Sequence, residues 1–455
     1  MAAFRASALL LLTALAAAAA PAVIVFNDDG GWNWLQDPRV VVAAGRIFAG
    51  SVATGGRDPD RAGNVEVACY DPAAGAVRRS VLHHAGTPVE KHAWKEDHNA
   101  PALLAWPDGR VLAVYALHGV EAKLYLRSWS PGAGSWSAER TVMLTPGSRA
   151  ACPNLAFLPG ANRGQGRLFC FFRGLGSLQM PSWISSDDRG ETWSIGGSLL
   201  KVGRAGPGAP DLAWGKDYLP YAKYAADADS TIHLVYNLGH QSAFGNALFD
   251  LPIRDGRFPR DAAAGSGTRI FQAGPDDVAW ICGVEVDDAG RPFVGYAVQK
   301  NLAGRPKRGA DHRYRLARWT GAAWSDHEIA FAGSRVHLVP GDSCTGLIAL
   351  DPRDSSCVVI STDADPRTGL PLLSAADGRR HWEIFQGATA DGGRSWSWTA
   401  LTRDSAADNI RPVVPRWGGP ERAVLWLRGT MRMPDDYHLS VLGEILPRSE
   451  STPSP

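Results

Sequence analysis

Two histidines twenty residues apart have a spacing that suits proton transfer. His98 stands in the run Asp97-His98-Asn99-Ala100-Pro101, and His118 follows a strand–turn–strand pattern over residues 102–116. A hairpin returns the chain to the end at which it began, so both imidazoles are expected at one end of it. Imidazole titrates near neutral pH, and two converging rings can share proton-transfer work there. Asn99 is included as a substrate-binding candidate.

Other candidates follow at strand ends farther along the chain. Arg173 closes the apolar run 168–172, and an arginine can hold a carboxylate through two parallel hydrogen bonds. Tyr221 and Tyr224 lie on one predicted strand, so one of them is expected in the core and the other at a groove or in solvent. His240 is added as a further groove residue.

Each candidate also has a plain structural interpretation. His98 beside Asp97 suits a turn cap, a purpose that Asn99 would serve as well. His118 at a strand end suits a surface histidine, and Arg173 suits the solvated end of a buried strand. Acidic pairs in Gly- or Ser-containing turns favour turn formation over calcium binding.

Composition favours one large all-β domain over several smaller ones. The 455 residues include 50 glycines, 31 prolines and 17 tryptophans, with 20% charged residues, which describes a turn-rich chain with ample apolar material. The formal net charge of +1 gives no global reason to expect nucleic acid or an anionic membrane as partner, although a local basic groove stays open.

The N-terminus has the pattern of a secretory signal. One positive charge at Arg5 precedes the apolar run 8–20, which ends in small residues suited to cleavage. A membrane anchor is the alternative, but no stop-transfer cluster flanks the run. We expect a signal peptide over 1–20, a single propeller domain over 21–446, a disordered tail over 447–455, and a secreted, periplasmic or extracellular protein.

The six cysteines show no CxxC spacing of the kind that indicates zinc or redox chemistry. Disulfides are allowed in an exported chain, and Cys344 with Cys357 could close a loop. The alternative for each is a small buried hydrophobic residue.

Internal repetition indicates the architecture. The octets 186–193 and 389–396 both fit S/T-x-D-x-G-x-S/T-W, the Asp-box pattern. Degenerate copies of the pattern, which keep the Gly and Trp but lack the Asp, occur at 130–136 and 320–324. The Asp accepts hydrogen bonds within a tight turn, the Gly supplies an unusual dihedral, and the Trp packs beneath the hairpin. Several copies form a repeat signal.

Alternating apolar runs group into seven sets with room for four short strands each. Radial repetition of four-stranded sheets predicts an all-β, seven-bladed β-propeller, with a pair of β-sandwiches as the alternative. The sets are about 38–82, 102–144, 153–199, 220–259, 277–331, 346–401 and 409–446.

Several motifs resemble the BNR/Asp-box repeat-containing family, which includes ulvan lyases of polysaccharide lyase families 24 and 25. The resemblance spans roughly residues 25–445. It is carried by Trp32-Asn33-Trp34-Leu35-Gln36-Asp37-Pro38-Arg39, Asp97-His98-Asn99-Ala100-Pro101-Ala102-Leu103, Pro107-Asp108-Gly109-Arg110, Pro220-Tyr221-Ala222-Lys223-Tyr224, Asn237-Leu238-Gly239-His240 and Tyr314-Arg315-Leu316-Ala317-Arg318-Trp319.

The resemblance implies a groove on the propeller face lined by a histidine pair, an arginine and tyrosine. His98 and His118 match the histidines, Arg173 the arginine, and Tyr221 the later tyrosine. Two positions depart from the family. Cys152 stands where a tyrosine often precedes Pro-Asn, and Leu219 stands where an arginine can precede Pro-Tyr.

The expected reaction is β-elimination at a uronic acid of an anionic, ulvan-like polysaccharide. It needs a base for the C5 proton, positive charge at the carboxylate and an acid for the departing oxygen. We expect His118 as the base and Arg173 at the carboxylate, with His98 or Tyr221 supplying the remaining proton or positioning the sugar. The scheme needs no metal or other cofactor, leaves open a structural ion, and suits a monomer.

Two other function classes remain open. A sialidase needs a cluster of three arginines, a tyrosine–glutamate pair and an acidic donor, and the scattered glutamates show no such arrangement. A non-catalytic glycan-binding propeller would stack sugars on tryptophans, although tryptophans also pack blades. The tryptophans considered for that role are Trp32, Trp34, Trp94 and Trp183.

Overall fold

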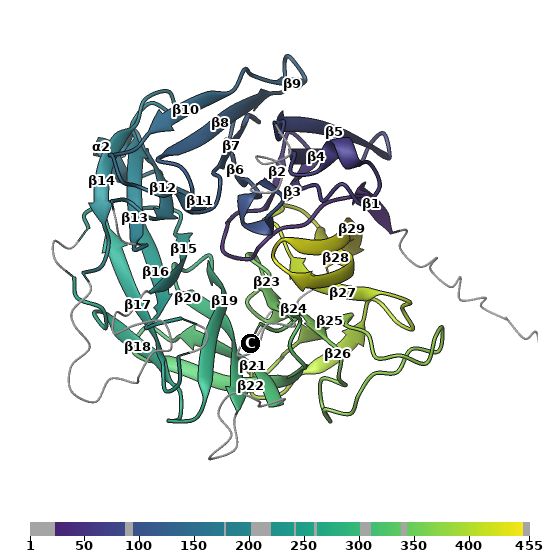
Figure 1. Cartoon of the computed structure of the whole chain (residues 1–455). Coiled ribbons are helices and arrows are strands. Elements are labelled where there is room, and N and C mark those ends of the chain that lie inside the picture. Colours follow the sequence, from purple (N-terminus) through teal and green to yellow (C-terminus); the bar gives the residue numbers. More distant parts are fainter. Residues whose placement is uncertain are drawn as a thin grey trace, which may run out of the picture.

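A computed structural model describes residues 23–86, 94–176, 179–201, 220–240, 243–258, 262–300, 311–337 and 344–448 of the chain. Within these ranges the strands form seven small antiparallel sheets arranged in a ring (Figure 1). The first strands of successive sheets contact one another around the centre. The predicted seven-bladed β-propeller is therefore confirmed.

Six of the seven blades are built from consecutive strands, with the first strand at the centre and the last at the rim (Figure 1). The first three contain β2 (Val40–Ala43), β3 (Arg46–Val52), β4 (Val65–Asp71) and β5 (Ala76–His83); β6 (Ala102–Ala105), β7 (Val111–Tyr115), β8 (Lys123–Ser130), β9 (Ser135–Trp136) and β10 (Arg140–Met143); and β11 (Ala151–Leu158), β12 (Arg167–Arg173), β13 (Pro181–Ser186) and β14 (Ser194–Ser198). The next three contain β15 (Tyr221–Ala226), β16 (Thr231–Asn237), β17 (Ala247–Arg254) and β18 (Thr268–Gln272); β19 (Val278–Val286), β20 (Pro292–Lys300), β21 (Asp311–Trp319) and β22 (Trp324–Gly333); and β23 (Ile348–Leu350), β24 (Cys357–Thr362), β25 (Glu383–Ala388) and β26 (Ser397–Ala400).

The last blade closes the ring with a strand from the other end of the chain. It contains β27 (Asp408–Val413), β28 (Glu421–Met433), β29 (Asp436–Pro447) and β1 (Ile24–Asn27), which adds to β29 with Ile24 opposite Gly443. Pairing the two ends of the domain in one sheet leaves the ring without an open junction. Short helical turns connect strands elsewhere: η1 (Pro59–Arg61), η2 (Asp97–Asn99) and α2 (Ala161–Gly164).

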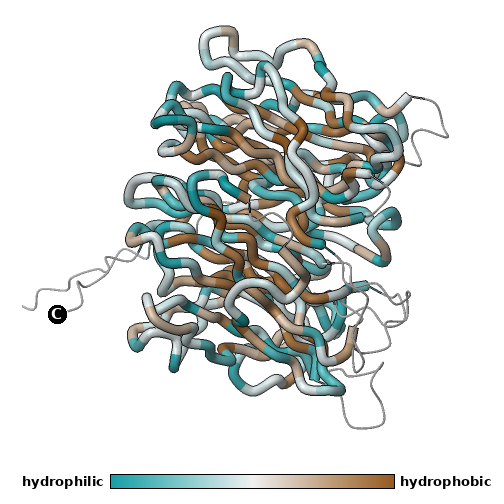
Figure 2. Tube along the Cα trace, turned by 90° about the vertical axis from the view of Figure 1, so that its left-hand side faces the viewer, coloured by the Kyte–Doolittle hydropathy of each residue, from teal (hydrophilic) through white to brown (hydrophobic). Residues whose placement is uncertain are grey.

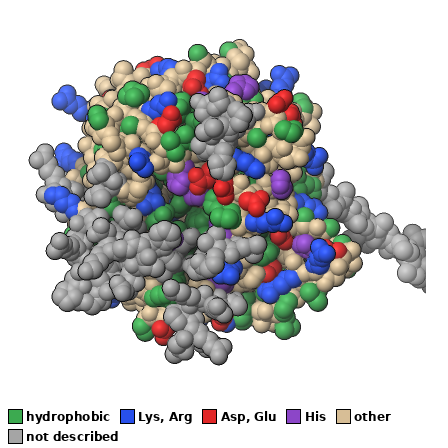
Figure 3. All heavy atoms as spheres, viewed as in Figure 1, with side chains coloured by type: hydrophobic (Ala, Val, Ile, Leu, Met, Phe, Trp, Pro, Cys, Tyr) green, Lys and Arg blue, Asp and Glu red, His purple; other side chains and the backbone are tan. Residues whose placement is uncertain are grey.

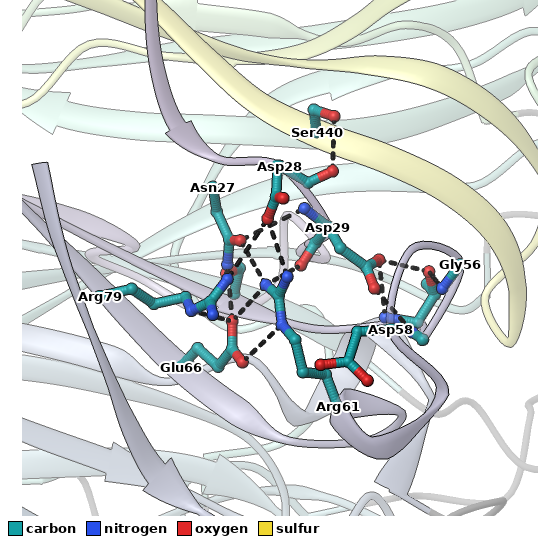
Figure 4. A network of polar contacts seen from close by, with 12 residues as sticks. Asn27, Asp28, Asp29, Gly56, Asp58, Arg61, Glu66, Arg79 and Ser440 are labelled. Atoms are coloured by element: carbon teal, nitrogen blue, oxygen red, sulfur yellow. Dashed lines mark hydrogen bonds and ion pairs between the residues drawn. The ribbon is translucent and has the colours of Figure 1, made fainter.

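A network of polar contacts joins β1 to the first blade (Figure 4). Arg61 donates to Glu66 at 2.9 and 3.2 Å, to Asp28 at 2.8 Å and to the side chain of Asn27 at 2.7 Å. Ser440 of β29 donates to the Asp28 carbonyl. The closure is therefore held by directional charged contacts as well as by the β1–β29 pairing.

The core lies between blades, because each central strand is covered on both sides by its neighbours. In β12 the six residues from Leu168 to Arg173 are all buried, as the near-continuous apolar run predicts. Figure 2 shows hydrophobic strands inside the body and hydrophilic loops at its surface. Among the described residues, no helix is long and apolar enough to cross a membrane.

The two octets form the turns between third and fourth strands of their blades. In the first, Asp188 accepts from the Thr192 backbone at 2.8 Å and from its hydroxyl at 2.5 Å, and Trp193 donates to the Gly190 carbonyl. In the second, Asp391 makes the equivalent contacts to Ser395. The Asp, Gly and Trp thus play the turn-forming parts that their chemistry predicts.

Two expected strand groups differ from the structure. The fourth group was expected to end near 259, but β18 lies at Thr268–Gln272, because a Gly- and Ala-rich segment separates it from β17. The seventh group supplies three strands, and β1 supplies the fourth. All six cysteines lie within the described residues, and none forms a disulfide. The expected signal peptide lies outside the described residues, as does all of the expected tail except Pro447 and Arg448.

Candidate functional site

The predicted site residues gather where first strands begin and second strands end. His98 lies in η2 just before β6, His118 follows β7, Arg173 ends β12, and Tyr221 begins β15. In an antiparallel blade the start of the first strand and the end of the second lie side by side. One face of the ring therefore carries all four side chains.

The two histidine rings are in direct contact. His98 and His118 are stacked with centroids 4.4 Å apart and an interplanar angle of 14°. The His98 side chain is 14% exposed and that of His118 is 29% exposed. The hairpin formed by β6 and β7 brings the pair together, as the spacing predicts.

Glu96 orients His118. Its carboxylate oxygens lie 2.9 and 3.0 Å from His118 Nδ1, which places a proton on Nδ1 and leaves the Nε2 lone pair unprotonated. Burial and the positive charge of His98 lower the pKa of His118, and outweigh the Glu96 contact. Burial opposes the charge on Glu96, but its contacts to His118 and His98 lower the pKa of Glu96 to about 2. His118 is therefore a neutral imidazole at pH 7.

Asp97 gives His98 the opposite character. His98 Nδ1 lies 2.7 Å from Asp97 and 3.2 Å from Glu96. Burial favours the neutral ring, but the charges of Asp97 and Glu96 prevail and raise the pKa of His98 to about 9. Asp97 is fully buried; burial opposes its charge, yet Arg411 at 2.5 Å and His98 hold its pKa well below the usual range.

Asn33 acts on the same ring from the other side. Its side-chain nitrogen lies 3.1 Å from His98 Nε2, and its oxygen accepts from the Leu35 backbone, which fixes the amide orientation. The carboxylates hold a proton on Nδ1, whereas the amide N–H favours an unprotonated Nε2, so Asn33 opposes only the second proton that makes the ring an imidazolium. A neutral hydrogen bond contributes about 0.5–1.5 kcal/mol, less than two close charges in a buried site. The carboxylates therefore decide the protonation state.

Arg173, Tyr221 and His240 form the adjoining wall. The guanidinium carbon of Arg173 lies 3.7 Å from the centroid of the Tyr221 ring, and Tyr221 contacts His240 and Trp280 with centroids 5.4 and 5.1 Å apart. Arg173 donates to the Gln179 carbonyl at 2.9 Å, while its Nε has no hydrogen-bond partner among the described residues. This arginine therefore carries a buried donor whose hydrogen bond is unmade among the described residues.

The structure places two expected binding residues beneath the site. Asn99 is fully buried; its oxygen accepts the His118 backbone N–H at 2.7 Å and its nitrogen donates to the Trp94 carbonyl. Tyr224 is half-buried: it stacks on Phe171 with centroids 4.1 Å apart and packs against the core between the third and fourth blades, and it lines a small hollow with Arg173 and Tyr221. Asn99 therefore supports the site through the fold, and substrate contact by Tyr224 stays a prediction.

Cys152 completes the wall next to the histidines. It is buried, with a positive φ of 53°, in a bulge of β11 where the pairing with β12 shifts between Ala151 and Asn154. Burial raises the pKa of the Cys152 thiol to about 12. Leu219, the other departure from the family pattern, lies outside the described residues.

Several residues of the site carry no signal in the sequence. Glu96 and Asp97 flank His98 and were available as its neighbours, but Asn33 and Arg411 come from opposite ends of the chain. Lys223 is buried below the site, where it contacts Asp37 and the Trp34 carbonyl. Below it, the first strands of all seven blades surround a cavity of about 450 Å³.

The tryptophans proposed as sugar platforms occupy the core. Trp32, Trp34 and Trp94 are 0%, 3% and 4% exposed, so their faces are covered by protein. Trp183 is half-buried and stacks on Phe258 with centroids 4.1 Å apart.

On the face seen in Figure 3, histidine and acidic side chains gather near the middle.

Solved structures share this fold over nearly the whole chain. An ulvan lyase of polysaccharide lyase family 25, bound to -[GlcA(1-4)Rha3S]-, superposes with a TM-score of 0.65 at 14% identity, covering 94% of this chain and 97% of that one. Polysaccharide lyase Uly1 superposes with a TM-score of 0.57 at 11% identity, covering 91% and 90%.

At these identities the likeness concerns the fold. No protein-family model matches the chain, and no curated protein matches it in sequence. The argument for function therefore depends on the geometry of the site.

Proposed function

We propose that this protein is a secreted lyase that cleaves a uronate-containing anionic polysaccharide by β-elimination. The observation that carries the proposal is the stacked histidine pair, whose opposite pKa shifts favour a neutral His118 beside a protonated His98. A base and a positively charged group in contact are what removal of a proton next to a carboxylate requires.

In this scheme His118 takes the C5 proton through Nε2, while Glu96 holds Nδ1 and disperses the charge that forms on the ring. Arg173 and the imidazolium of His98 stabilise the negative charge that develops on the uronate carboxylate. The departing oxygen receives its proton from Tyr221 or from His98.

The fold supports the substrate class. The ulvan lyase with the same fold was solved with a fragment that contains glucuronate and sulfated rhamnose. A non-catalytic glycan-binding role is less well supported, because three of the four tryptophans expected to hold sugars are buried.

The test is incubation of the protein with ulvan and a panel of other uronate polysaccharides, followed by ultraviolet absorbance of the unsaturated uronyl product. We expect a rise with at least one uronate substrate that His118→Ala lacks. A Tyr221→Phe variant that keeps turnover would assign the second proton transfer to His98. Glycan binding without any rise in absorbance, on every substrate, would contradict the lyase proposal.

A further inference from the structure

Cys152 brings a thiol to the histidine pair. A ring nitrogen of His98, a ring nitrogen of His118 and the Sγ of Cys152 all lie within 4.8 Å of one another. Two imidazoles and a thiolate form a donor set that zinc and related borderline metals prefer. The three donors come from separate parts of the chain: η2, the residues after β7, and β11.

We propose that His98, His118 and Cys152 bind one divalent transition-metal ion, such as Zn²⁺, and that this ion blocks the site. In a tetrahedral site, metal–nitrogen distances of about 2.0–2.1 Å and a metal–sulfur distance of about 2.3 Å leave the donor atoms roughly 3.3–3.6 Å apart. The observed spacing therefore closes onto an ion with shifts of about an ångström.

The surroundings of the histidines favour such a site. Glu96 accepts from His118 Nδ1 at 2.9 Å, the carboxylate–histidine contact that orients imidazole ligands toward metals. Binding of the ion displaces one ring proton of His98 and the thiol proton of Cys152 to solvent, because both groups ligate a metal only when deprotonated. The rings are stacked, so one of them must tilt for a nitrogen of each to reach the same ion. His118 has the more exposed side chain, at 29%, and follows the end of its strand, which allows that tilt.

The backbone fixes the thiol. The backbone of Cys152 has a φ of 53° within the bulge of β11, a left-handed conformation that is uncommon for residues other than glycine. Asn154 holds this conformation by donating to the Cys152 carbonyl at 2.9 Å and to the Leu35 carbonyl at 2.7 Å. Bulges commonly re-aim a side chain at a site, and this one sets Sγ beside the imidazoles.

The metal binding does not depend on the proposed lyase function, whereas its inhibitory consequence does. The proton-transfer groups of the proposed reaction would be the ligands of the ion, so metal and substrate compete for the same groups. The fourth coordination position stays open to water or to a substrate oxygen.

The experiment is titration of the untagged protein with Co²⁺, followed by absorbance. We expect one equivalent to give a near-ultraviolet thiolate-to-cobalt band and the visible bands of four-coordinate cobalt. Both sets of bands should disappear in Cys152→Ser. In His118→Gln the apparent affinity for Co²⁺, measured from the near-ultraviolet band, should fall at least tenfold. Cys69→Ser, which changes the half-buried cysteine of β4, is the matched control and should bind as the unaltered protein does.

Absence of a thiolate band in the unaltered protein, or an equal band in Cys152→Ser, would overturn the proposal. Circular dichroism of each variant separates lost binding from lost folding. Cys152→Tyr gives a second route, because it removes the sulfur ligand and should abolish the cobalt bands. If lyase turnover is found, Zn²⁺ should inhibit the unaltered protein at least tenfold more tightly than Cys152→Ser. Lack of turnover leaves the cobalt result intact.

Discussion

The charged side chains at the ring closure and those around the histidine pair are paired in different ways. At the ring closure, Arg61 directs all three side-chain nitrogens at protein acceptors, and the fully buried Glu66 accepts from both Arg61 and Asn27. In the wall beside the histidine pair, Arg173 has a buried Nε without a hydrogen-bond partner among the described residues. The guanidinium of the first cluster is fully paired, whereas that of the second keeps one buried N–H without a partner among the described residues.

The two clusters also differ in how they shift the pKa values of their basic side chains. Burial opposes the charge of Arg61, but its contacts to Glu66 and Asp28 prevail and raise the pKa of Arg61, so this guanidinium stays charged at any ordinary pH. In the histidine cluster the pKa values of two identical side chains shift in opposite directions. Burial and the charge of His98 lower the pKa of His118 despite its contact to Glu96, whereas Asp97 and Glu96 overcome burial and raise the pKa of His98. The fully paired Arg61 thus stabilises the fold, whereas the unequal surroundings of the two histidines make His98 an acid and His118 a base.

The largest expected effect comes from His118. His118→Gln removes the proposed base, so kcat/KM on the cleaved polysaccharide should fall by about 10²–10⁴. The free energy of unfolding should change little, because the side chain is partly exposed. Kinetics and denaturant unfolding on the same preparation check both statements. A His118→Gln variant that is less stable but keeps normal turnover would contradict the account, because it would give the histidine cluster a structural role.

The ring-closure cluster should respond in the opposite sense. Arg61→Ala leaves the buried carboxylate of Glu66 without its principal partner, and breaking such a pair costs about 3–5 kcal/mol of stability. Arg79→Ala is the matched control, since Arg79 is 38% exposed, lies 3.6 Å from Glu66 and should contribute about 0.2–1 kcal/mol. Denaturant unfolding measures both, and equal losses would show that burial does not set the difference.

A smaller effect is expected at Arg173. Arg173→Lys keeps the positive charge but loses the planar fork that matches a carboxylate. Hydrogen bonds to charged groups contribute about 1.5–3 kcal/mol, so kcat/KM should fall by about 10–100-fold. Steady-state kinetics on the cleaved substrate check this. Unchanged kinetics would mean that the guanidinium of Arg173 does not hold the substrate carboxylate.

The sequence predicted what depends on local pattern. The octets at 186–193 and 389–396 indicate the turns between third and fourth strands. The interval between His98 and His118 indicates a hairpin. Both patterns are short-range features of the sequence. The closure by β1 was not predicted, because Ile24 pairs with Gly443 and no local pattern records that contact. The same holds for Arg411, which reaches Asp97 across more than three hundred residues.

Burial was the other quantity that the sequence could not supply. Asn99 beside His98 has the composition of a binding residue, but packing of η2 directs its amide inward to the His118 backbone. Cys152 appeared as a departure from a family pattern, and only the bulge in β11 shows that its sulfur lies beside both imidazoles.

The most direct test of the division of roles between the histidines is the pH profile of kcat/KM. His118 must be unprotonated to accept a proton, so the rate should fall as pH drops through its pKa, below its ordinary value of about 6.5. His98 must be protonated, so the rate should fall again as pH rises through about 9. We predict a bell with these two limbs, from which His98→Gln removes the alkaline limb. A rate that rises in a single step near 6.5 and stays constant beyond pH 10 would contradict the account.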